Sequence, residues 1–357
     1  ERLVHFWANH FSVSVGKPGT QFEVGPHEFA AIRPHVLGRF SDMLEAAVLH
    51  PAMLLYLDQF QSIGPNAPFT QRRARRNPDA QGRPRGLNEN LAREVLELHT
   101  LGVDGGYAQA DVTELARALT GWTVPGIGRV GRFAEDQPSG AAFVALAHEP
   151  GARLVLGRSY AAGGAKQALA ILRDLAAHPA TARHIATKFA RHFAGDTPPP
   201  ALVARLEADY LRTGGDLASL TATLIDAPEA WVPGPVKFRT PFEWLVAGLR
   251  LTGAEDLPAQ RIVGALTQLG QVPWRAPSPA GYDDVAPVWA GPDALVRRVE
   301  LAERIAQGAP HPGSVIARAE AAFPGALGEA TRTQLARAES GSQALALLLV
   351  SPEMMRR

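Results

Sequence analysis

Residues 88–103 read NENLAREVLELHTLGV, and this stretch decides which kind of fold the sequence predicts. Its apolar side chains Leu91, Val95 and Leu98 recur at intervals of three and four residues. A helix turns by about 100° per residue, so these side chains share one face, and the charged and amide side chains take the other. Gly102 then ends the pattern, because glycine readily adopts the left-handed backbone that stops a helix. The stretch predicts an amphipathic helix.

The same spacing of apolar residues recurs along most of the chain, whereas alternating and β-branched stretches are short and scarce. We therefore expect an all-α fold, an irregular multi-helix bundle with long loops rich in proline and glycine. Thr181 and Asp216 stand where they can cap helix N-termini. The predicted helices cover 2–12, 28–37, 39–57, 88–101, 109–120, 164–177, 181–194, 200–213, 216–225, 241–252, 258–269 and 292–307, with three more between 314 and 350.

The middle of the chain, 126–160, is the one segment with strand character. Arg132-Phe133, 142–145 and 153–156 are short runs with strand-forming residues, and glycine and proline interrupt them. These runs predict a small β-hairpin insertion in an otherwise helical chain.

One domain of two lobes is expected over residues 1–357, since the helices on both sides of a soft boundary near 157–164 are apolar enough to share a core. Two further regions, 62–86 and 272–291, are predicted to be irregular. Loops of that length in compact domains are more often functional or disordered than incidental. The chain opens at Glu1, inside an amphipathic run and without methionine, so we expect a native N-terminal segment to precede it.

The composition excludes several classes of protein. The 357 residues include no cysteine, which rules out disulfides, thiolate metal sites and a cysteine nucleophile. The formal charge is +1, so the chain lacks the net positive field of a general nucleic-acid binder, and nucleic acid is not an expected partner. No apolar run reaches the roughly 18–20 residues that span a bilayer. No metal-binding, phosphate-loop or dinucleotide motif appears, so we expect no metal and no cofactor.

The stretch that decides the fold also holds the densest set of chemically useful side chains. A second helix, predicted over 109–120, follows a short glycine-rich turn, so the two helices must lie side by side, and their polar faces can converge on one pocket. Glu94 lies at the border of the apolar stripe, where partial burial and the neighbouring Glu97 raise its pKa and a nearby Arg117 would lower it. The candidate catalytic residues are Glu94, Glu97, His99 and Asp111, and the candidate substrate-binding residues are Asn88, Asn90, Arg93, Tyr107, Arg117 and Trp122.

Several blocks of the sequence together form a recognisable signature. The most specific are NENLARE and LELHTLG within 88–102 and DGGYAQADVTELARALTGWT at 104–123. Further blocks lie before and after these two: FWANHF at 6–11, HPAMLLYLD at 50–58, HEPGARLVLG at 148–157, VKFRTPFEWLV at 236–246 and LGQVPWRAPSPAGY at 269–282. Together they resemble the bacterial family called domain of unknown function 1800, and every candidate site residue named above lies at a matching position.

The resemblance implies a mostly helical bacterial protein that is exported to the periplasm or secreted, commonly encoded beside another exported family, with no established reaction. The chain departs from the family's usual pattern at three places. Glu149 and Arg153 stand where aspartate and lysine are usual, which puts a lysine-specific role at residue 153 in doubt. Ala108 stands where a capping threonine is common, which weakens a helix cap by about 1 kcal/mol.

The leading hypothesis is a hydrolase or lyase that acts on a carbohydrate-like polymer. Glu94 would be the general acid and Glu97 or Asp111 the base or nucleophile, since carboxylates in different environments acquire separate roles. Arg93 and Arg117 would orient them. His99, near a helix C-terminus that favours its protonated form, would carry a second proton or contact the substrate.

The alternative is a non-catalytic envelope protein that binds a co-exported protein partner, in which the same polar residues form a structural brace. The arginine-rich loop, residues 72–85, has two interpretations of its own. It gathers a polysaccharide or another anionic ligand toward the N-terminus of the helix at 88–101, or it is a solvated surface loop.

Overall fold

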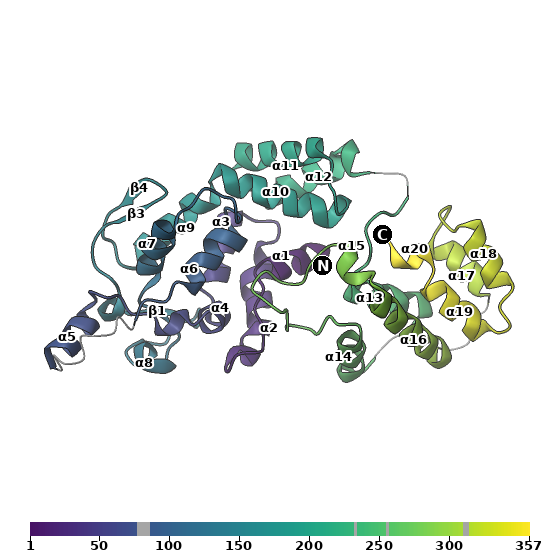
Figure 1. Cartoon of the computed structure of the whole chain (residues 1–357), viewed down its shortest axis with the longest axis horizontal. Coiled ribbons are helices and arrows are strands. Elements are labelled where there is room, and N and C mark those ends of the chain that lie inside the picture. The colour runs from purple at the N-terminus through teal and green to yellow at the C-terminus, as the bar shows by residue number, and fades with distance from the viewer. Residues whose placement is uncertain (77–85, 232–233, 255–256, 310–313) are drawn as a thin grey trace. The chain divides into compact units, whose positions relative to one another are not determined.

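The computed structural model describes residues 1–76, 86–231, 234–254, 257–309 and 314–357 (Figure 1). Helices dominate these residues, and the strands among them form two antiparallel sheets of two strands each. The all-α fold with a small β insertion is therefore confirmed. The chain divides into two compact units: the first comprises 1–189, 200–227 and 276–281, and the second 190–199, 228–275 and 282–357. The soft boundary expected near 157–164 lies inside the first unit.

The first unit holds the strands and most of the irregular helices. Its α-helices are α1 (Arg2–His10), α2 (Val24–Pro26), α3 (Phe40–Val48), α4 (Pro51–Tyr56), α5 (Pro68–Arg76), α6 (Asn90–Glu94), α7 (Gln109–Leu119), α8 (Gly128–Gly131), α9 (Ala165–Ala176), the first part of α10 (Pro179–Ala194), α11 (Pro200–Thr213) and α12 (Leu217–Asp226). Its π-helices are η2 (His27–Ile32) and η6 (Val95–His99), and its 3-10 turns are η1 (Thr20–Phe22), η3 (Arg33–His35), η4 (Gln59–Gln61) and η7 (Ala145–Ala147).

An aromatic core holds the first unit together. Trp7, Phe11 and Phe40 are fully buried, and the centroids of their rings lie 5.6–6.3 Å apart. An aromatic side chain removes about 150–250 Å² from water when it is buried, so this cluster provides much of the driving force for folding. It fixes α1 against α3, and through them the loop and helices that follow.

The two sheets are short and tie loops together. Strand β1 (Trp122–Thr123) pairs with β2 (Ala142–Phe143), and β3 (Arg153–Val155) pairs with β4 (Arg158–Tyr160) through a turn at residues 156–157. The prediction of a strand at Arg132-Phe133 is wrong, because these residues form a turn. The backbone N–H of Phe133 donates instead to the carbonyl of Val130 at 3.0 Å, which continues the turn at the end of α8.

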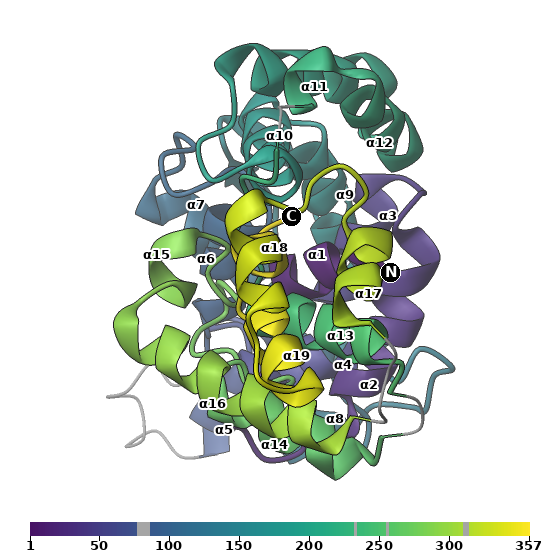
Figure 2. The ribbon, with the colours of Figure 1, turned by 90° about the vertical axis from the view of Figure 1, so that its right-hand side faces the viewer.

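The second unit is a helical bundle of η8 (Pro228–Ala230), α13 (Pro241–Thr252), α14 (Ala259–Gln268), α15 (Ala286–Trp289), α16 (Pro292–Gly308), α17 (Val315–Ala322), α18 (Glu329–Ala336), α19 (Gly341–Leu349) and α20 (Pro352–Met355). Helix α16 packs against α19 (Figure 2). Trp244 is fully buried at the centre of the core, and its indole N–H donates to the carbonyl of Leu349 at 2.9 Å. The indole is therefore satisfied inside an otherwise apolar core.

Several predicted helices are interrupted. The helix expected over 39–57 is α3 followed by α4, because Pro51 lacks an N–H and starts a new helix that the His50 ring caps by accepting the Ala52 N–H at 3.2 Å. The helix expected over 28–37 is η2 followed by η3, with Pro34 in η3. Helices α5 and α15 lie within the regions predicted to be irregular.

Candidate functional site

Asn88 anchors the start of the predicted site helix, which the structure forms as α6 followed by the π-helix η6. Its side-chain amide donates to the carbonyl of Leu57 at 2.9 Å, and its side-chain oxygen accepts the N–H of Asn90 at 2.9 Å. Its own backbone N–H donates to the hydroxyl of Ser62 at 3.1 Å. One side chain thus joins the segment 57–62 to the N-terminus of α6.

The polar faces of α6 and α7 meet in a closed network of hydrogen bonds. Arg93 donates to the side chain of Gln109 at 2.9 Å and lies 3.6 Å from the carboxylates of both Glu89 and Glu97. The carboxylate of Glu89 accepts in turn from Gln109 at 2.8 Å and from Thr113 at 2.7 Å. These groups satisfy one another, so the network ties the two helices together.

Glu94 differs from its neighbours Glu89 and Glu97 because its carboxylate is not part of the network. It is half-buried, and across the described part of the chain it has no hydrogen-bond or ion-pair partner. Burial first, and then the charge of Glu97, raise its pKa, while Arg93 lowers it. Burial and a hydrogen bond to Glu97 raise the pKa of Tyr107 to about 12, so Glu97 is engaged by both Tyr107 and Arg93.

The carboxylate of Asp111 accepts hydrogen bonds from two backbone N–H groups. Its two carboxylate oxygens accept the N–H groups of Ala108 and Leu156, each at 2.7 Å. Leu156 has a φ of 49°, a left-handed conformation that is strained for leucine. The carboxylate therefore caps the N-terminus of α7 and holds the strained turn between β3 and β4.

Replacing Asp111 with alanine is expected to lower the free energy of unfolding by about 1–3 kcal/mol, because one helix cap is lost and the Leu156 N–H loses its acceptor. Chemical denaturation measures the change, with the exposed Asp104→Ala as the matched control. Equal stability of the two variants would contradict the bracing role of Asp111.

His99 lies inside the core of the first unit. It is 0% exposed, and its pKa is lowered to about 3, by burial first and then by the charges of Lys188, His27 and His184. The protonated form expected from the helix C-terminus is therefore not favoured, because the loss of hydration outweighs the helix dipole.

Trp122, the last of the predicted substrate-binding residues, lies in β1. Its ring packs against that of Phe143, with the two ring centroids 5.7 Å apart.

The carboxylate of Glu114 links Arg117 on α7 to Arg153 on β3. It pairs with Arg117 one turn along the helix and lies 3.5 Å from the guanidinium of the buried Arg153. Arg153 also donates to the carbonyls of Glu149 and Pro150 at 2.8 and 2.6 Å. Arg117 thus belongs to a brace between α7 and the β3 strand.

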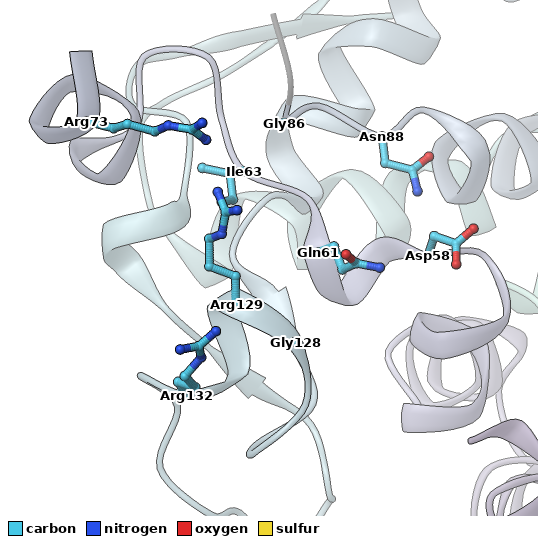
Figure 3. Close-up of a pocket in the computed structure, with 9 residues that line it drawn as sticks. All are labelled: Asp58, Gln61, Ile63, Arg73, Gly86, Asn88, Gly128, Arg129 and Arg132. Atoms are coloured by element: carbon cyan, nitrogen blue, oxygen red, sulfur yellow. The ribbon is translucent and has the colours of Figure 1, made fainter. Parts of the chain in front are cut away.

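A hollow of about 720 Å³ opens beside the N-terminus of α6 (Figure 3). Of the predicted site residues, Asn88 lines this hollow and the others do not. The hollow is lined by Asp58, Gln61, Ile63, Arg73, Gly86, Asn88, Gly128, Arg129 and Arg132. In the close-up the three arginines stand apart from Asp58, Gln61 and Asn88 across the view (Figure 3). Helix α5 supplies Arg73, and α8 with the turn after it supplies Arg129 and Arg132.

The charges around the hollow do not balance. Arg73, Arg129 and Arg132 are exposed, and within the described ranges none of them has an ion-pair or hydrogen-bond partner. The one carboxylate of the lining, on Asp58, is bound by the ammonium of Lys17 at 2.5 Å. Asp58 has a φ of 58°, a left-handed conformation of the kind that clusters at functional sites. The hollow therefore presents three uncompensated guanidinium groups.

The sequence pointed to part of this hollow. Residues 72–76 of the predicted anion-binding loop form the end of α5 and include Arg73, whereas residues 77–85 lie outside the described residues. Arg129 and Arg132 were missed, and their three-residue spacing at a helix end is a weak signal that many surface helices share. The described residues include no group of three histidine, aspartate or glutamate side chains that could hold a metal ion. No described helix is long and apolar enough to span a membrane.

The comparisons with known proteins agree with the signature in the sequence. Residues 1–356 match the model of a family described as "Protein of unknown function (DUF1800)". No curated protein and no solved structure matches the chain.

Proposed function

We propose that this chain, which belongs to the DUF1800 family of proteins of unknown function, binds an anionic polymer in the arginine-lined hollow. The observation that carries the proposal is a set of three guanidinium groups, on Arg73, Arg129 and Arg132, that line one hollow of about 720 Å³ and have no partner among the described residues. Guanidinium groups present a planar fork of donors that matches carboxylate, sulfate and phosphate groups. The volume falls within the range typical of ligand sites.

The charge distribution favours local recognition of a chain segment. The net charge of +1 gives the whole protein no long-range attraction for polyanions, so the binding energy must come from the contacts in the hollow. Gln61 and Asn88 add amide groups to the lining, which can bind hydroxyl groups or other neutral polar parts of the ligand.

Binding without catalysis is the role that the hollow supports best. Asp58 is held by Lys17, and the predicted acid–base residues Glu94, Glu97 and Asp111 do not line the hollow. The closed networks of Glu89, Arg93 and Asp111 support the expectation of a structural brace. A co-exported partner and an extracytoplasmic location, which the family resemblance implies, stay predictions.

A hydrolase or lyase remains the second candidate, because Glu94 is half-buried, has a raised pKa and lacks a partner among the described residues. The same binding experiment can also test for catalysis. Polymer incubated with the protein is analysed for chain length, and shortening that Glu94→Gln abolishes would replace the binding role with a catalytic one.

The double variant Arg129→Ala/Arg132→Ala is expected to bind polygalacturonate and inorganic polyphosphate at least about 10-fold more weakly than the wild type. Each lost charge-assisted hydrogen bond contributes about 1.5–3 kcal/mol, and 1.4 kcal/mol corresponds to a factor of ten. Isothermal titration calorimetry at fixed salt measures the dissociation constants. The matched control is Arg261→Ala/Arg337→Ala, which removes two exposed arginines of the second unit. Equal weakening by the two double variants would show that only net charge matters and would refute the site.

A further inference from the structure

An aromatic pair lies beside the arginines of the hollow. Phe133 follows Arg132 directly and is 60% exposed, although its ring is 4.8 Å from that of Phe69. Phe69 stands four residues before Arg73 on α5, so the two side chains share one face of that helix. The two phenylalanines thus stand on the segments that carry Arg73 and Arg132, next to the hollow but outside its lining.

The position of Phe133 is fixed by the structure beneath it. Phe69 packs on a buried cluster of Val130, Val144 and Ala147. The backbone N–H of Gly126 donates to the carbonyl of Gly131 at 2.9 Å, which closes the α8 loop just before Arg132. A Cβ on Gly131 would lie 2.2 Å from the carbonyl oxygen of Val124, so the loop packs too tightly to admit any side chain there. The backbone that leads to Phe133 is thus held in place, and the Phe133 ring lies against Phe69.

We infer that the occupant of the hollow is an acidic polysaccharide. A sugar ring would pack on the exposed face of Phe133 while its carboxylate or sulfate group pairs with Arg129 or Arg132. This inference rests on the proposed function and narrows its ligand from any polyanion to one that carries rings. An exposed aromatic ring adds little for a ligand made of charge alone, but it binds the apolar face of a ring well.

A single-stranded nucleic acid also combines rings with charge. Single-strand binders track the phosphate backbone along a broad basic groove, whereas this chain has a net charge of only +1. A local cluster of three arginines beside one exposed aromatic ring therefore fits an acidic polysaccharide better than a nucleic acid.

The test compares the wild type with Phe133→Ala and with Phe22→Ala, a control at a phenylalanine that is 75% exposed and lies on η1, not on the segments that carry the three arginines. Three probes are titrated at one salt concentration: polygalacturonate, inorganic polyphosphate and oligo(dT). Phe133→Ala is expected to weaken binding of polygalacturonate about 5- to 10-fold and of polyphosphate less than about 2-fold. Phe22→Ala should change neither. Phe133→Leu, which keeps the apolar packing on Phe69, should lose most of the same affinity for polygalacturonate.

The outcomes separate the inference from the proposed function. Phe133→Ala could weaken the binding of polygalacturonate and of polyphosphate equally, or weaken neither. Either result would overturn the assignment of the ligand as a polysaccharide, while the arginine variants would still report on anion binding. Tighter binding of oligo(dT) than of polygalacturonate, with the same dependence on Phe133, would assign the site to nucleic acid. If the arginine variants bind every probe as the wild type does, the proposed function itself fails.

Discussion

Lowering the pH from 7 to 5 is expected to destabilise the protein by about 4 kcal/mol through two buried histidines, His27 and His99. Both are almost inaccessible to water, and burial is the largest cause that lowers the pKa of each to about 3. His50 adds to the effect at His27, and Lys188 adds to it at His99. A charge on either ring would lack hydration, and no described carboxylate contributes to the pKa of either one.

The sign of the effect follows from proton binding. An unfolded histidine takes up its proton near pH 6.5, whereas the folded rings do so only near pH 3, so between these values the unfolded state binds more protons. The stability is therefore fully present above pH 6.5 and is lost as the pH falls from 6.5 toward 3. Each histidine contributes a loss of about 2 kcal/mol by pH 5.

Urea unfolding at pH 7, 6 and 5 measures this loss. His99→Gln removes one of the histidines whose pKa is lowered by burial, so its free energy of unfolding should fall less steeply with pH, by up to about 1.4 kcal/mol per pH unit. His178→Gln, at a partly exposed histidine just before α10, is the matched control and should follow the wild type. An identical pH slope in the wild type and His99→Gln would contradict the account of the buried ring.

Replacing Lys237 with methionine is expected to destabilise the second unit by about 3–5 kcal/mol. Lys237 is 2% exposed, and its ammonium donates to the carboxylate of Asp196 at 2.7 Å and to the carbonyl of Asp284 at 2.5 Å. It also lies 3.2 Å from the carboxylate of Asp284. Burial alone would raise the pKa of Asp284, but its hydrogen bond with His192 and the charges of His192 and Lys237 lower it. Without Lys237, the two carboxylates lose the cation between them.

Chemical denaturation checks the loss against Lys166→Ala, which removes an exposed lysine and should cost little. The variant Lys237→Met/Asp196→Asn should recover part of the stability, since it removes one of the two carboxylates that lose the Lys237 ammonium. A cost for Lys237→Met no greater than for Lys166→Ala would show that the cluster contributes nothing to the fold.

Helices were predicted best where the spacing of apolar residues agrees with the capping residues at the helix ends. Helices α11 and α13 span the predicted residues, and Asp216 caps α12 by accepting the Ser219 N–H at 2.8 Å. Thr181 does not cap α10, which begins at Pro179; its hydroxyl donates to the carbonyl of Leu175 instead. Helix α5 was missed because its run of arginines resembles a solvated loop and its few apolar contacts come from distant parts of the chain.

The candidate site was harder to predict because tertiary structure decides what each polar group contacts. The carboxylate of Asp111 is occupied by the N–H of Leu156, 45 residues further along, and no local pattern reveals that bond. Arg73 lines the same hollow as Arg129 and Arg132 because Phe69 of α5 packs on the buried cluster that includes Val130 of α8. The residues that define the hollow therefore come from segments that look unrelated in the sequence.

An anionic polymer in the hollow would shield the arginines that line it, so chemical footprinting of arginines shows whether the hollow is the binding site. The protein is treated with phenylglyoxal with and without saturating polygalacturonate, and in parallel with inorganic polyphosphate, and the modification rate of each arginine is read by mass spectrometry. A bound polymer is expected to slow modification of Arg73, Arg129 and Arg132 several-fold and to leave Arg261 and Arg337 unchanged. Equal rates at the three lining arginines with and without polymer, or equal protection of the two controls, would show that the polymer does not bind in the hollow.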